Sequence, residues 1–343
     1  PPPPPPPPPT WDTAVLGFLG SCPWTLGLLL FCGAWGFITL STYLLPMIWA
    51  NVRGVQNLKK KYKADWALVT GGSSGIGRSL AEALARQGLN IVLVGLDDAL
   101  LKDAHEKMRA AFPELEVRKV GCDLTRADGG YMKAIAAATD DVHISLLFNN
   151  AGFIVTGFFH DSPIGKQMAN IQCNAVAGAR ITHHFLPKMY ASGRPGLVCF
   201  TSSAAAYIPS PFTALYSATK AFISRFATSL AAEAGPQGVD VLAVHPSPVR
   251  SNFLEGTAKL DMIDNFYKFS TGPDAVVPQI FRKVGRGQVL ADLGPVGLVM
   301  RLLTKLLDDN FFASAFAVFA GLMPDYAKHA GPAGMTGHLR KKK

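Results

Sequence analysis

The sequence predicts a doubly wound α/β domain built on a parallel sheet, and three observations predict it. From about residue 64 onward, short apolar segments alternate with longer amphipathic segments. Strands that alternate with helices of this length pair in parallel and are covered by helices on both faces. A glycine-rich turn follows the first apolar segment, and polar residues or prolines stand at the ends of the later ones. This combination is typical of a Rossmann-type domain, in which ligands bind beyond the carboxyl ends of the strands.

The glycine-rich turn lies in WALVTGGSSGIGRSLAEALARQGLNIVLVG, residues 66–95. This segment predicts a strand, a loop, an amphipathic helix and a second strand. Glycines let the backbone approach a pyrophosphate closely, and the amino end of the following helix stabilises its charge. The spacing is GxxxGxG rather than the generic GxGxxG, and a turn without a ligand is the alternative. We predict a dinucleotide loop with the candidate binding residues Gly71, Ser73, Ser74, Gly75, Ile76 and Gly77.

The alternation continues along the chain. Helices are expected near 98–112, 125–138 and 162–191, and another begins at about Tyr216. Further strands are expected in VRKVGCDLT (117–125), HISLLFNNAG (143–152), GLVCFTSS (196–203) and VDVLAVHPSP (239–248). Because the carboxyl ends of parallel strands meet at one edge of a sheet, the residues that follow them should converge. These residues are Gly71 to Gly77, Asp123, Asn150, Ser203 and Pro246.

The stretch SAAAYIPSPFTALYSATK, residues 203–220, carries the candidate catalytic groups. Tyr216 and Lys220 lie one helical turn apart and should share one face of a helix. A cation close to a phenol lowers its pKa, so Tyr216 becomes a candidate proton donor. Ser203 could hydrogen-bond the same substrate oxygen that Tyr216 protonates. The alternative is a helix start with capping hydroxyls and a solvated lysine.

The amino-terminal region predicts a membrane anchor. Residues 13–52 contain no Asp, Glu, Lys, Arg or His, and about 20 helical residues cross a bilayer core. We expect a span over about 25–46, with a re-entrant hairpin turning near Pro23 as the alternative. A cleaved signal peptide is less expected, because its apolar region is shorter. Basic residues in the segment 53–63 follow at once, which by the positive-inside tendency favours a cytosolic catalytic domain.

The carboxyl-terminal region, residues 293–323, predicts two further helices. Arg301 and Lys305 make the first of them amphipathic, which suits the membrane interface, whereas docking on the domain or a dimer contact is the alternative. The sequence therefore divides into a proline-rich tail (1–12), a membrane anchor (13–52), a basic linker (53–63), a catalytic domain (64–292) and carboxyl-terminal helices with a basic tail (293–343).

Composition narrows the class of protein. The formal net charge is +9 and the mean hydropathy is +0.20, which is high for a soluble enzyme. The basic residues gather at 53–63 and at the terminal KKK, beside apolar segments, so they indicate contact with a membrane surface and not with nucleic acid. The five cysteines form no CxxC and no metal-ligand spacing, so no metal site is expected.

Several motifs together resemble the short-chain dehydrogenase/reductase family. They are TGGSSGIG at 70–77, NNAG at 149–152, Asn174, Ser203 and YSATK at 216–220. They stand in the family's order and spacing over about residues 64–255. The anchor, the basic linker and the phrase IPSPFTALYSATKAFISRFATSLAAE also resemble one group within that family. This group contains the endoplasmic-reticulum very-long-chain 3-oxoacyl-CoA reductases and the microsomal 17-beta-hydroxysteroid dehydrogenases.

The resemblance implies roles for individual residues. Tyr216 would be the proton donor, Lys220 would lower its pKa and bind the nicotinamide ribose, and Ser203 would orient the carbonyl. Asn174 would hold a water in a proton relay. The remaining cofactor contacts would come from the glycine loop and from Asp123, Asn150, Ala151, Gly152, Pro246 and Val249.

The choice of cofactor is open at its usual position. Members of the family often carry a basic residue for NADP or an acidic one for NAD after the second strand, but Gly95 and Leu96 stand there. The absence of a carboxylate at the first position, together with Arg78 nearby, favours NADPH. Asp97 and Asp98 are the opposing observation, so NADH is the alternative. A further departure is Ser247 in HPSPV, where the family commonly has a glycine.

The expected substrate is lipid-like. Apolar residues beyond the nucleotide edge favour a long apolar body, and the segment 260–269 resembles a mobile amphipathic lid. We expect a membrane-anchored enzyme of the endoplasmic reticulum that reduces a 3-oxoacyl-CoA in fatty-acid elongation. Another organelle, a steroid or other lipid ketone as substrate, and a catalytically idle subunit of a membrane complex are alternatives. A homodimer or another membrane partner is compatible with each. The apolar candidates are Phe153, Ile154, Val155, Phe158, Phe159, Ile208, Pro209, Pro211, Phe212, Phe253 and Leu254.

Overall fold

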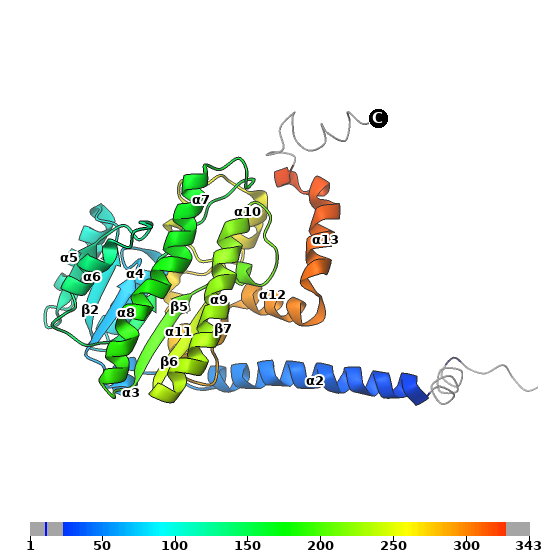
Figure 1. Cartoon of the computed structure of the whole chain (residues 1–343), viewed down its shortest axis with the longest axis horizontal. Helices are drawn as coiled ribbons and strands as arrows, with labels where there is room; N and C mark the ends of the chain where they lie inside the picture. The colour runs from blue at the N-terminus through cyan, green and yellow to red at the C-terminus, as the bar shows by residue number, and fades with distance from the viewer. Residues whose placement is uncertain (1–10, 12–22, 327–343) are drawn as a thin grey trace, which may run out of the picture. The chain divides into compact units, whose positions relative to one another are not determined.

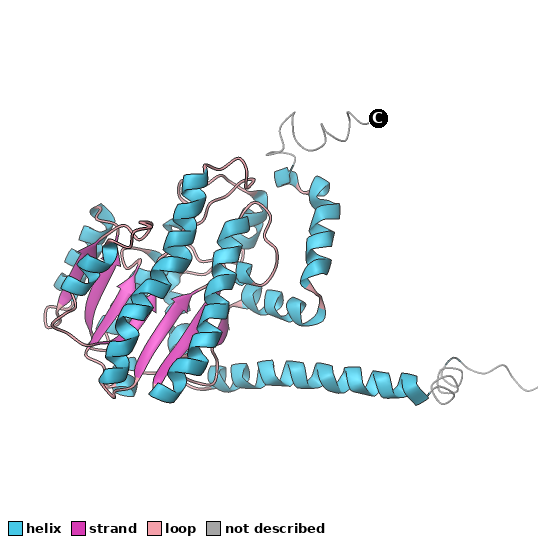
Figure 2. Ribbon diagram, in the orientation of Figure 1, coloured by secondary structure: helices cyan, strands magenta, loops and turns pink. Residues whose placement is uncertain are grey.

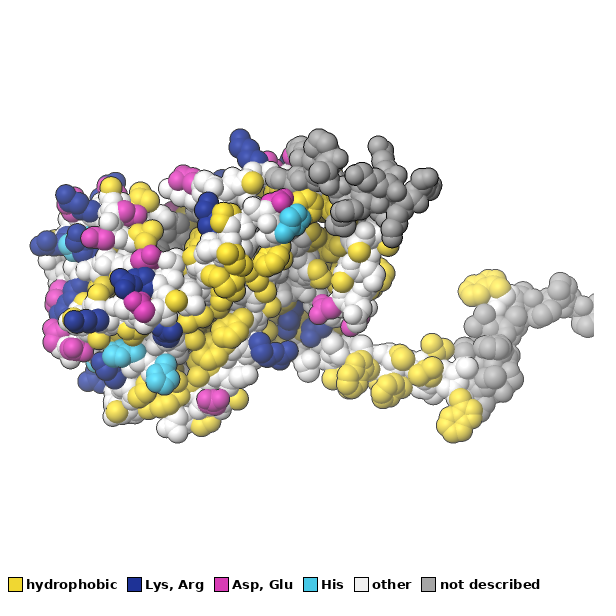
Figure 3. Space-filling model, turned by 45° about the horizontal axis from the view of Figure 1, so that its top comes forward, with side chains coloured by type: hydrophobic (Ala, Val, Ile, Leu, Met, Phe, Trp, Pro, Cys, Tyr) yellow, Lys and Arg dark blue, Asp and Glu magenta, His cyan; other side chains and the backbone are white. Residues whose placement is uncertain are grey.

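The computed structural model describes residue 11 and residues 23–326, so the predictions for the proline tract and the terminal lysines lie outside the described residues. The chain separates into two compact units, Pro1–Trp49 and Ala50–Lys343. Within the described ranges, one helix is long and apolar enough to cross a membrane: Trp24–Val52, with a mean hydropathy of 1.8. It belongs to α2 (Pro23–Val52), and hydrophobic side chains are exposed along it (Figure 3). The predicted span 25–46 falls inside this helix.

The second unit is built on a parallel sheet of seven strands in the order β3-β2-β1-β4-β5-β6-β7 (Figures 1 and 2). All neighbouring strands pair in parallel, which is the doubly wound order. The six predicted strands are confirmed, whereas β7 was not predicted. The strands are β1 (Trp66–Thr70), β2 (Asn90–Gly95), β3 (Val117–Gly121), β4 (Ile144–Asn149), β5 (Gly196–Thr201), β6 (Val239–Pro246) and β7 (Leu290–Leu293).

Helices cover both faces of this sheet, because apolar strand residues alternate between the two faces and each face needs a cover. One hydrophobic cluster joins the sheet to α4 (Gly75–Ala85), α5 (Ala99–Ala111) and α11 (Pro273–Lys283). The other joins it to α6 (Tyr131–Ala137), α8 (Ala177–Ala191) and α9 (Ala214–Ala234). In Figures 1 and 2, α8 and α9 lie across the front of the sheet. The Rossmann-type fold is thereby confirmed.

The helix predicted over 162–191 is interrupted by a π-helical turn. The structure has α7 (Ile164–Ile171), a π segment (Gln172–Val176) and then α8. A π turn inserts extra backbone into an α-helix and is frequent at functional sites. Here it contains Asn174, whose side chain is buried.

The basic segment predicted as a linker contains a short helix that packs on the catalytic unit. This helix is α3 (Leu58–Tyr62), whose two end residues are buried. The Tyr62 hydroxyl donates to Asp240 at 2.6 Å, and Lys61 Nζ donates to the carbonyl of Val284 at 2.9 Å. The run of lysines did not indicate this packing. Leu58 and Tyr62 lie four residues apart and form one apolar side of the helix, and this side contacts the domain.

The first predicted carboxyl-terminal helix also docks on the domain. It is α12 (Pro295–Leu306), followed by α13 (Asp309–Phe319). Arg301 was expected to face a membrane interface, but its guanidinium lies 4.9 Å from the ring centre of Tyr207, a buried residue of the domain. Docking is therefore the alternative that the structure supports for α12. On α13, Phe312 is buried, whereas Phe311, Val318 and Phe319 are exposed.

Candidate active site

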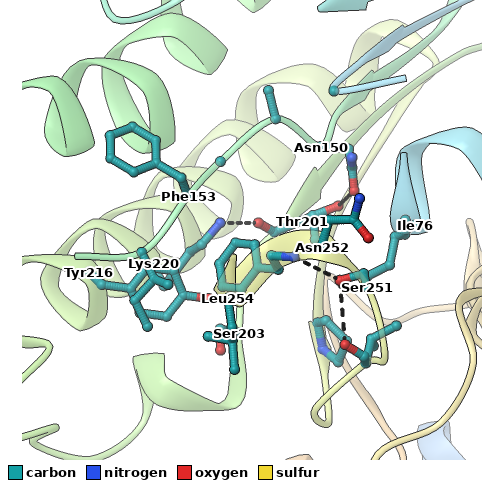
Figure 4. A pocket seen from close by; sticks show the side chains of 18 of the residues that line it. Ile76, Asn150, Phe153, Thr201, Ser203, Tyr216, Lys220, Ser251, Asn252 and Leu254 are labelled. Atoms are coloured by element: carbon teal, nitrogen blue, oxygen red, sulfur yellow. Dashed lines mark hydrogen bonds between the residues drawn. The ribbon is translucent and has the colours of Figure 1, made fainter. Parts of the chain in front are cut away.

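A cavity of about 590 Å³ lies at the carboxyl ends of the strands. It is lined by residues of the glycine loop, of the ends of β2, β5 and β6, and of α9 (Figure 4). Every predicted site residue lines it except Gly77 and Asn174. The residues that follow the strand ends therefore converge on one cavity, as predicted.

The glycine loop has the shape of a ligand cradle. Gly71 and Gly75 have φ angles of +65° and +55°, a region that favours glycine. Ser74 is the N-cap residue of α4, but its side chain makes no capping hydrogen bond, so its hydroxyl can serve a ligand. The loop leads into the amino end of α4, where the exposed N–H groups and the helix dipole favour an anion.

Gly77 leaves no room for a side chain. A Cβ there would overlap the carbonyl oxygen of Gly71 and the side-chain nitrogen of Asn150. We expect Gly77→Ala to lower the free energy of unfolding by about 1–3 kcal/mol, the usual cost of overpacking, and to abolish dinucleotide binding. Thermal unfolding and cofactor titration would measure both effects. Gly165→Ala is the matched control, since nothing lies within 4 Å of its Cβ position; if both variants behaved alike, the close approach at Gly77 would not matter.

Asn150 ties together the ends of the central strands. Its side-chain nitrogen donates to the carbonyl of Thr70 at 3.2 Å, and its side-chain oxygen accepts from Thr201 at 3.0 Å. The Thr70 hydroxyl in turn accepts from the backbone N–H groups of Asn150 and Ala151. The NNAG motif therefore braces β1, β4 and β5 where they form the floor of the cavity.

Ser203, Tyr216 and Lys220 come together in the cavity wall (Figure 4). Tyr216 and Lys220 share one face of α9, with Lys220 Nζ 5.6 Å from the centre of the Tyr216 ring. Lys220 Nζ donates to the carbonyl of Thr201 at 2.8 Å. Tyr216 and Lys220 are both buried. The alternative of a solvated lysine at an ordinary helix start is therefore wrong.

The electrostatics of this pair differ from the prediction. Burial raises the pKa of Tyr216 to about 12, while its hydrogen bond with Ser203 acts in the opposite direction. Burial also lowers the pKa of Lys220 to about 8. The net pKa of Tyr216 is therefore raised and not lowered as predicted, because the loss of hydration disfavours the buried phenolate more than its surroundings favour it. Tyr216 is consequently neutral at pH 7, the state that a proton donor needs.

Asn174 holds a segment of backbone beside the candidate catalytic groups. Its side-chain oxygen accepts from the N–H of Phe153 at 2.9 Å, and its nitrogen donates to the carbonyl of Phe153 at 2.9 Å. Asn170, which the sequence did not single out, donates to the same carbonyl at 2.6 Å. Phe153 lines the cavity, so these two amides set the position of its wall. The role of Asn174 in holding a water stays a prediction.

The substrate side of the cavity is apolar, and the structure separates the predicted apolar residues into two groups. Phe153, Ile154, Ile208, Phe253 and Leu254 line the cavity, whereas the other six predicted residues do not. The predicted lid forms α10 (Asp261–Tyr267). It contributes Met262, Ile263, Phe266 and Tyr267 to the lining.

Val296 and Met300 of α12 also line the cavity and were missed. Their four-residue spacing on an apolar helix was visible in the sequence. Nothing in the sequence indicated which surface this helix would cover.

Gly95, Leu96 and Asp98 line the end of the cavity where the adenosine is predicted to bind. Asp98 is engaged as the N-cap of α5 and accepts from the N–H of Leu101 at 2.9 Å. Arg78 was expected to favour NADPH, but its guanidinium is paired with Glu82 and Asp103, at 3.1 Å each, and it does not line the cavity. Arg78 therefore adds no support for NADPH here, because its guanidinium is already paired with two carboxylates.

Comparison with known proteins agrees with this geometry. The family model described as short chain dehydrogenase matches residues 65–260. A very-long-chain 3-oxoacyl-CoA reductase-like protein of Arabidopsis thaliana is 30% identical over 246 residues, covering 70% of this chain and 78% of that protein. A very-long-chain 3-oxoacyl-CoA reductase of Ajellomyces capsulatus is 31% identical over 286 residues, covering 82% and 79%. A 7beta-hydroxysteroid dehydrogenase of Mediterraneibacter gnavus is 28% identical over 233 residues, covering 67% and 86%.

Solved structures show the same architecture. A structure described in a study of 7beta-hydroxysteroid dehydrogenase stereoselectivity superposes with a TM-score of 0.67 at 24% identity, covering 76% of this chain and all of that one. A short-chain dehydrogenase from Sphingobium yanoikuyae in complex with NADPH has a TM-score of 0.59 at 27% identity, covering 66% and 87%. The sequence match, the strand order and the grouping of Ser203, Tyr216 and Lys220 agree: the chain belongs to the short-chain dehydrogenase family.

Proposed function

We propose that the chain is a membrane-anchored oxidoreductase that uses NADPH to reduce the keto group of a long-chain 3-oxoacyl-CoA, as one step of fatty-acid elongation. The observation that carries the proposal is the place of Ser203 and Tyr216 in the wall of a cavity whose substrate side is apolar. A keto group would lie at the two hydroxyls and an acyl chain among the apolar residues. The relatives from Arabidopsis and Ajellomyces, which are named for this activity, support it.

The residues present fit a nicotinamide dinucleotide. The positive φ angles of Gly71 and Gly75 and the uncommitted side chain of Ser74 suit a pyrophosphate at the amino end of α4. Asp123 lines the adenosine side and is oriented by Thr125, whose N–H and hydroxyl donate to it at 2.8 and 2.7 Å. When bound, the cofactor would supply a hydride to the keto carbon.

The chain's own residues would manage the keto oxygen. Tyr216, neutral because burial raises its pKa to about 12, donates its hydroxyl proton to that oxygen as the carbon is reduced. The Ser203 hydroxyl hydrogen-bonds the same oxygen and orients the carbonyl. Lys220, whose pKa burial lowers to about 8, is still mostly cationic at pH 7. Its charge stabilises the phenolate that remains after the proton has left.

NADPH is favoured over NADH by what stands at the adenosine end. Gly95 and Leu96 place no carboxylate directly after β2, and the Asp98 carboxylate further along accepts from the N–H of Leu101 as the N-cap of α5. The NADPH complex of the Sphingobium relative gives further support. NADH is the alternative, and the ratio of the two dissociation constants would decide.

Reduction of a steroid or related ketone is the second candidate, and the lining of the cavity motivates it. Four charged residues line the cavity. Asp98 and Asp123 lie at the nucleotide side and Lys220 lies at the centre. Glu255 is the charged residue that remains for the substrate side. The substrate side of the described cavity therefore offers no cation to the phosphates of coenzyme A, which would have to lie outside it. The relative named 7beta-hydroxysteroid dehydrogenase supports this candidate.

We place the protein in the endoplasmic-reticulum membrane with the catalytic unit on the cytosolic side. The apolar helix within α2 supports an anchor, and the basic residues that follow it support this orientation. Another organelle membrane is the alternative location. A homodimer or a membrane-complex partner is compatible with the proposal.

Assays of the purified full-length chain in detergent should distinguish these functions. With NADPH, we expect kcat/KM for a long-chain 3-oxoacyl-CoA to exceed that for a steroid ketone by about 10-fold or more, since one or two well-placed apolar contacts give such a ratio. The reverse ranking would establish the steroid alternative. A chain that binds no NADPH at millimolar concentration would be the catalytically idle subunit instead.

A further inference from the structure

The segment from Pro295 to Tyr326, named here the C-terminal arm, contains α12, α13 and the residues after them. Its first helix contributes Val296 and Met300 to the cavity lining. We propose that this arm builds the substrate side of the cleft, and that Ser247 and Asp325 are positioning residues that fasten it at its two ends. The effect of these two residues on turnover rests on the proposed reductase function, whereas their structural role in holding the ends of the arm does not.

Ser247 fastens the start of the arm. Its buried hydroxyl accepts from the N–H groups of Val296 at 3.0 Å and Gly297 at 3.3 Å, at the amino end of α12. Two glycines allow this close approach: a Cβ on Gly294 would lie 2.7 Å from the Ser247 hydroxyl, and one on Gly297 would lie 2.9 Å from the carbonyl oxygen of His245. Serine in place of glycine in HPSPV therefore has a physical reason, because its hydroxyl caps a helix that glycine could not cap.

Asp325 fastens the end of the arm to the lid. Asp325 is only 1% exposed, and its carboxylate accepts from the backbone N–H groups of Asp261 at 2.6 Å and Met262 at 2.8 Å. These are the first two residues of α10, whose N-cap residue Leu260 has no side chain able to cap it. A carboxylate from 64 positions further along the chain thus satisfies two N–H groups that α10 cannot satisfy itself.

Tyr326 anchors the same point through aromatic packing. Its ring meets Phe158 edge-on at 5.2 Å and lies 6.2 Å from Phe212, while Phe158 and Phe212 lie 5.1 Å apart. The N–H of Gly157 donates to the carbonyl of Phe212 at 2.9 Å. The loops around Phe158 and Phe212 also supply the lining residues Phe153, Ile154 and Ile208. The end of the arm therefore joins three parts of the substrate wall that are distant in sequence.

The lid is consequently held at both ends. Asp325 holds its amino end, and the Tyr267 hydroxyl at its last turn donates to the carbonyl of Val249 at 3.0 Å. Asp325 does not line the cavity, so it acts through the lid residues Met262, Ile263 and Phe266. Loss of Asp325 should free the amino end of α10 and widen the apolar side without touching the nucleotide side.

The test compares Asp325→Ala with Asp325→Asn in the full-length chain. For Asp325→Ala we expect a rise in KM for the apolar ketone of about 5- to 30-fold, the range that loss of a helix cap gives, with an unchanged NADPH dissociation constant. Hydrogen exchange of the amides in α10 should accelerate by a similar factor. Asp325→Asn should restore most of both properties, because asparagine caps almost as well as aspartate. Ser247→Gly should raise the same KM and accelerate exchange at the start of α12.

Asp308→Ala is the matched control, because Asp308 caps α13 on the same arm by accepting from the N–H of Asn310 at 2.8 Å and contributes nothing to the lid or to the cavity. We expect it to leave KM and exchange in α10 unchanged. The proposal is overturned if Asp325→Ala leaves α10 exchange at the wild-type rate, or if it weakens NADPH binding as much as ketone binding. If the wild-type chain reduced no ketone, the proposed function would fail, while the exchange measurement would still decide the fastening.

Discussion

Replacing Tyr216 with phenylalanine should reduce turnover by about 100- to 10,000-fold, the range that a single general acid contributes, while NADPH affinity stays within about twofold. The phenol provides the proton, and burial raises its pKa to about 12, so no ionisation competes with donation at pH 7. Phenylalanine keeps the ring and its 5.8 Å contact with Phe253. Steady-state reduction and NADPH titration measure the two quantities on the same preparation.

Tyr190→Phe is the control for this variant. Tyr190 lies on α8 and does not line the cavity, so turnover should remain at the wild-type level. Retained turnover in Tyr216→Phe would remove Tyr216 from the mechanism, and an equal loss in both variants would point to a general effect of losing a phenol.

Lys220→Met should have opposite effects on activity and stability. We expect turnover to fall by about 100-fold or more, because the charge that stabilises the developing phenolate is lost. The temperature of unfolding at pH 7 should nevertheless rise, since burying a charged lysine is unfavourable. In the wild type, burial lowers the pKa of Lys220 from 10.5 to about 8, so between these values the unfolded chain binds more protons than the folded one. Wild-type stability should therefore rise with pH across this window.

Thermal unfolding of the wild type and of Lys220→Met, measured at pH 7 and at pH 10, tests this predicted rise in wild-type stability. The advantage of Lys220→Met should shrink at pH 10, where the wild-type side chain is already neutral in the folded state, and wild-type reduction should lose activity above about pH 8 as Lys220 loses its proton. Lys133→Met, at an exposed position of α6, should show neither effect. A stability gap that stayed constant with pH would contradict the assignment of this titration to Lys220.

The sheet was predictable from the sequence because its strands are apolar, β-branched and separated by helices of regular length. The strand β7 was missed because it has only four residues, LADL, and one of them is charged. Its Asp292 is buried and accepts from the Tyr207 hydroxyl at 2.6 Å, a contact between residues far apart in the chain. The π turn around Asn174 was missed for a similar reason, because neither composition nor periodicity marks it.

The nucleotide side of the site was also predictable, since its residues follow strand ends within short motifs. The direction of the pKa shift of Tyr216 was not predictable. The spacing placed Lys220 beside Tyr216, but only the burial of both groups showed that the loss of hydration has the larger effect on the pKa of the phenol. In the same way, Arg78 was close in sequence to the glycine loop, whereas its two carboxylate partners, Glu82 and Asp103, became visible only once α4 and α5 were packed together.

The sequence by itself determined the order of the motifs along the strands, the candidate catalytic residues Ser203, Tyr216 and Lys220, and an apolar segment long enough to cross a membrane. These features depend on local spacing and composition, which folding preserves. The tertiary structure alone decided how the substrate side is built, because Val296, Met300 and Asp325 reach the cleft and its lid from the far end of the chain. Contacts of this kind depend on which surfaces meet after the helices have packed, and no period in the sequence encodes that.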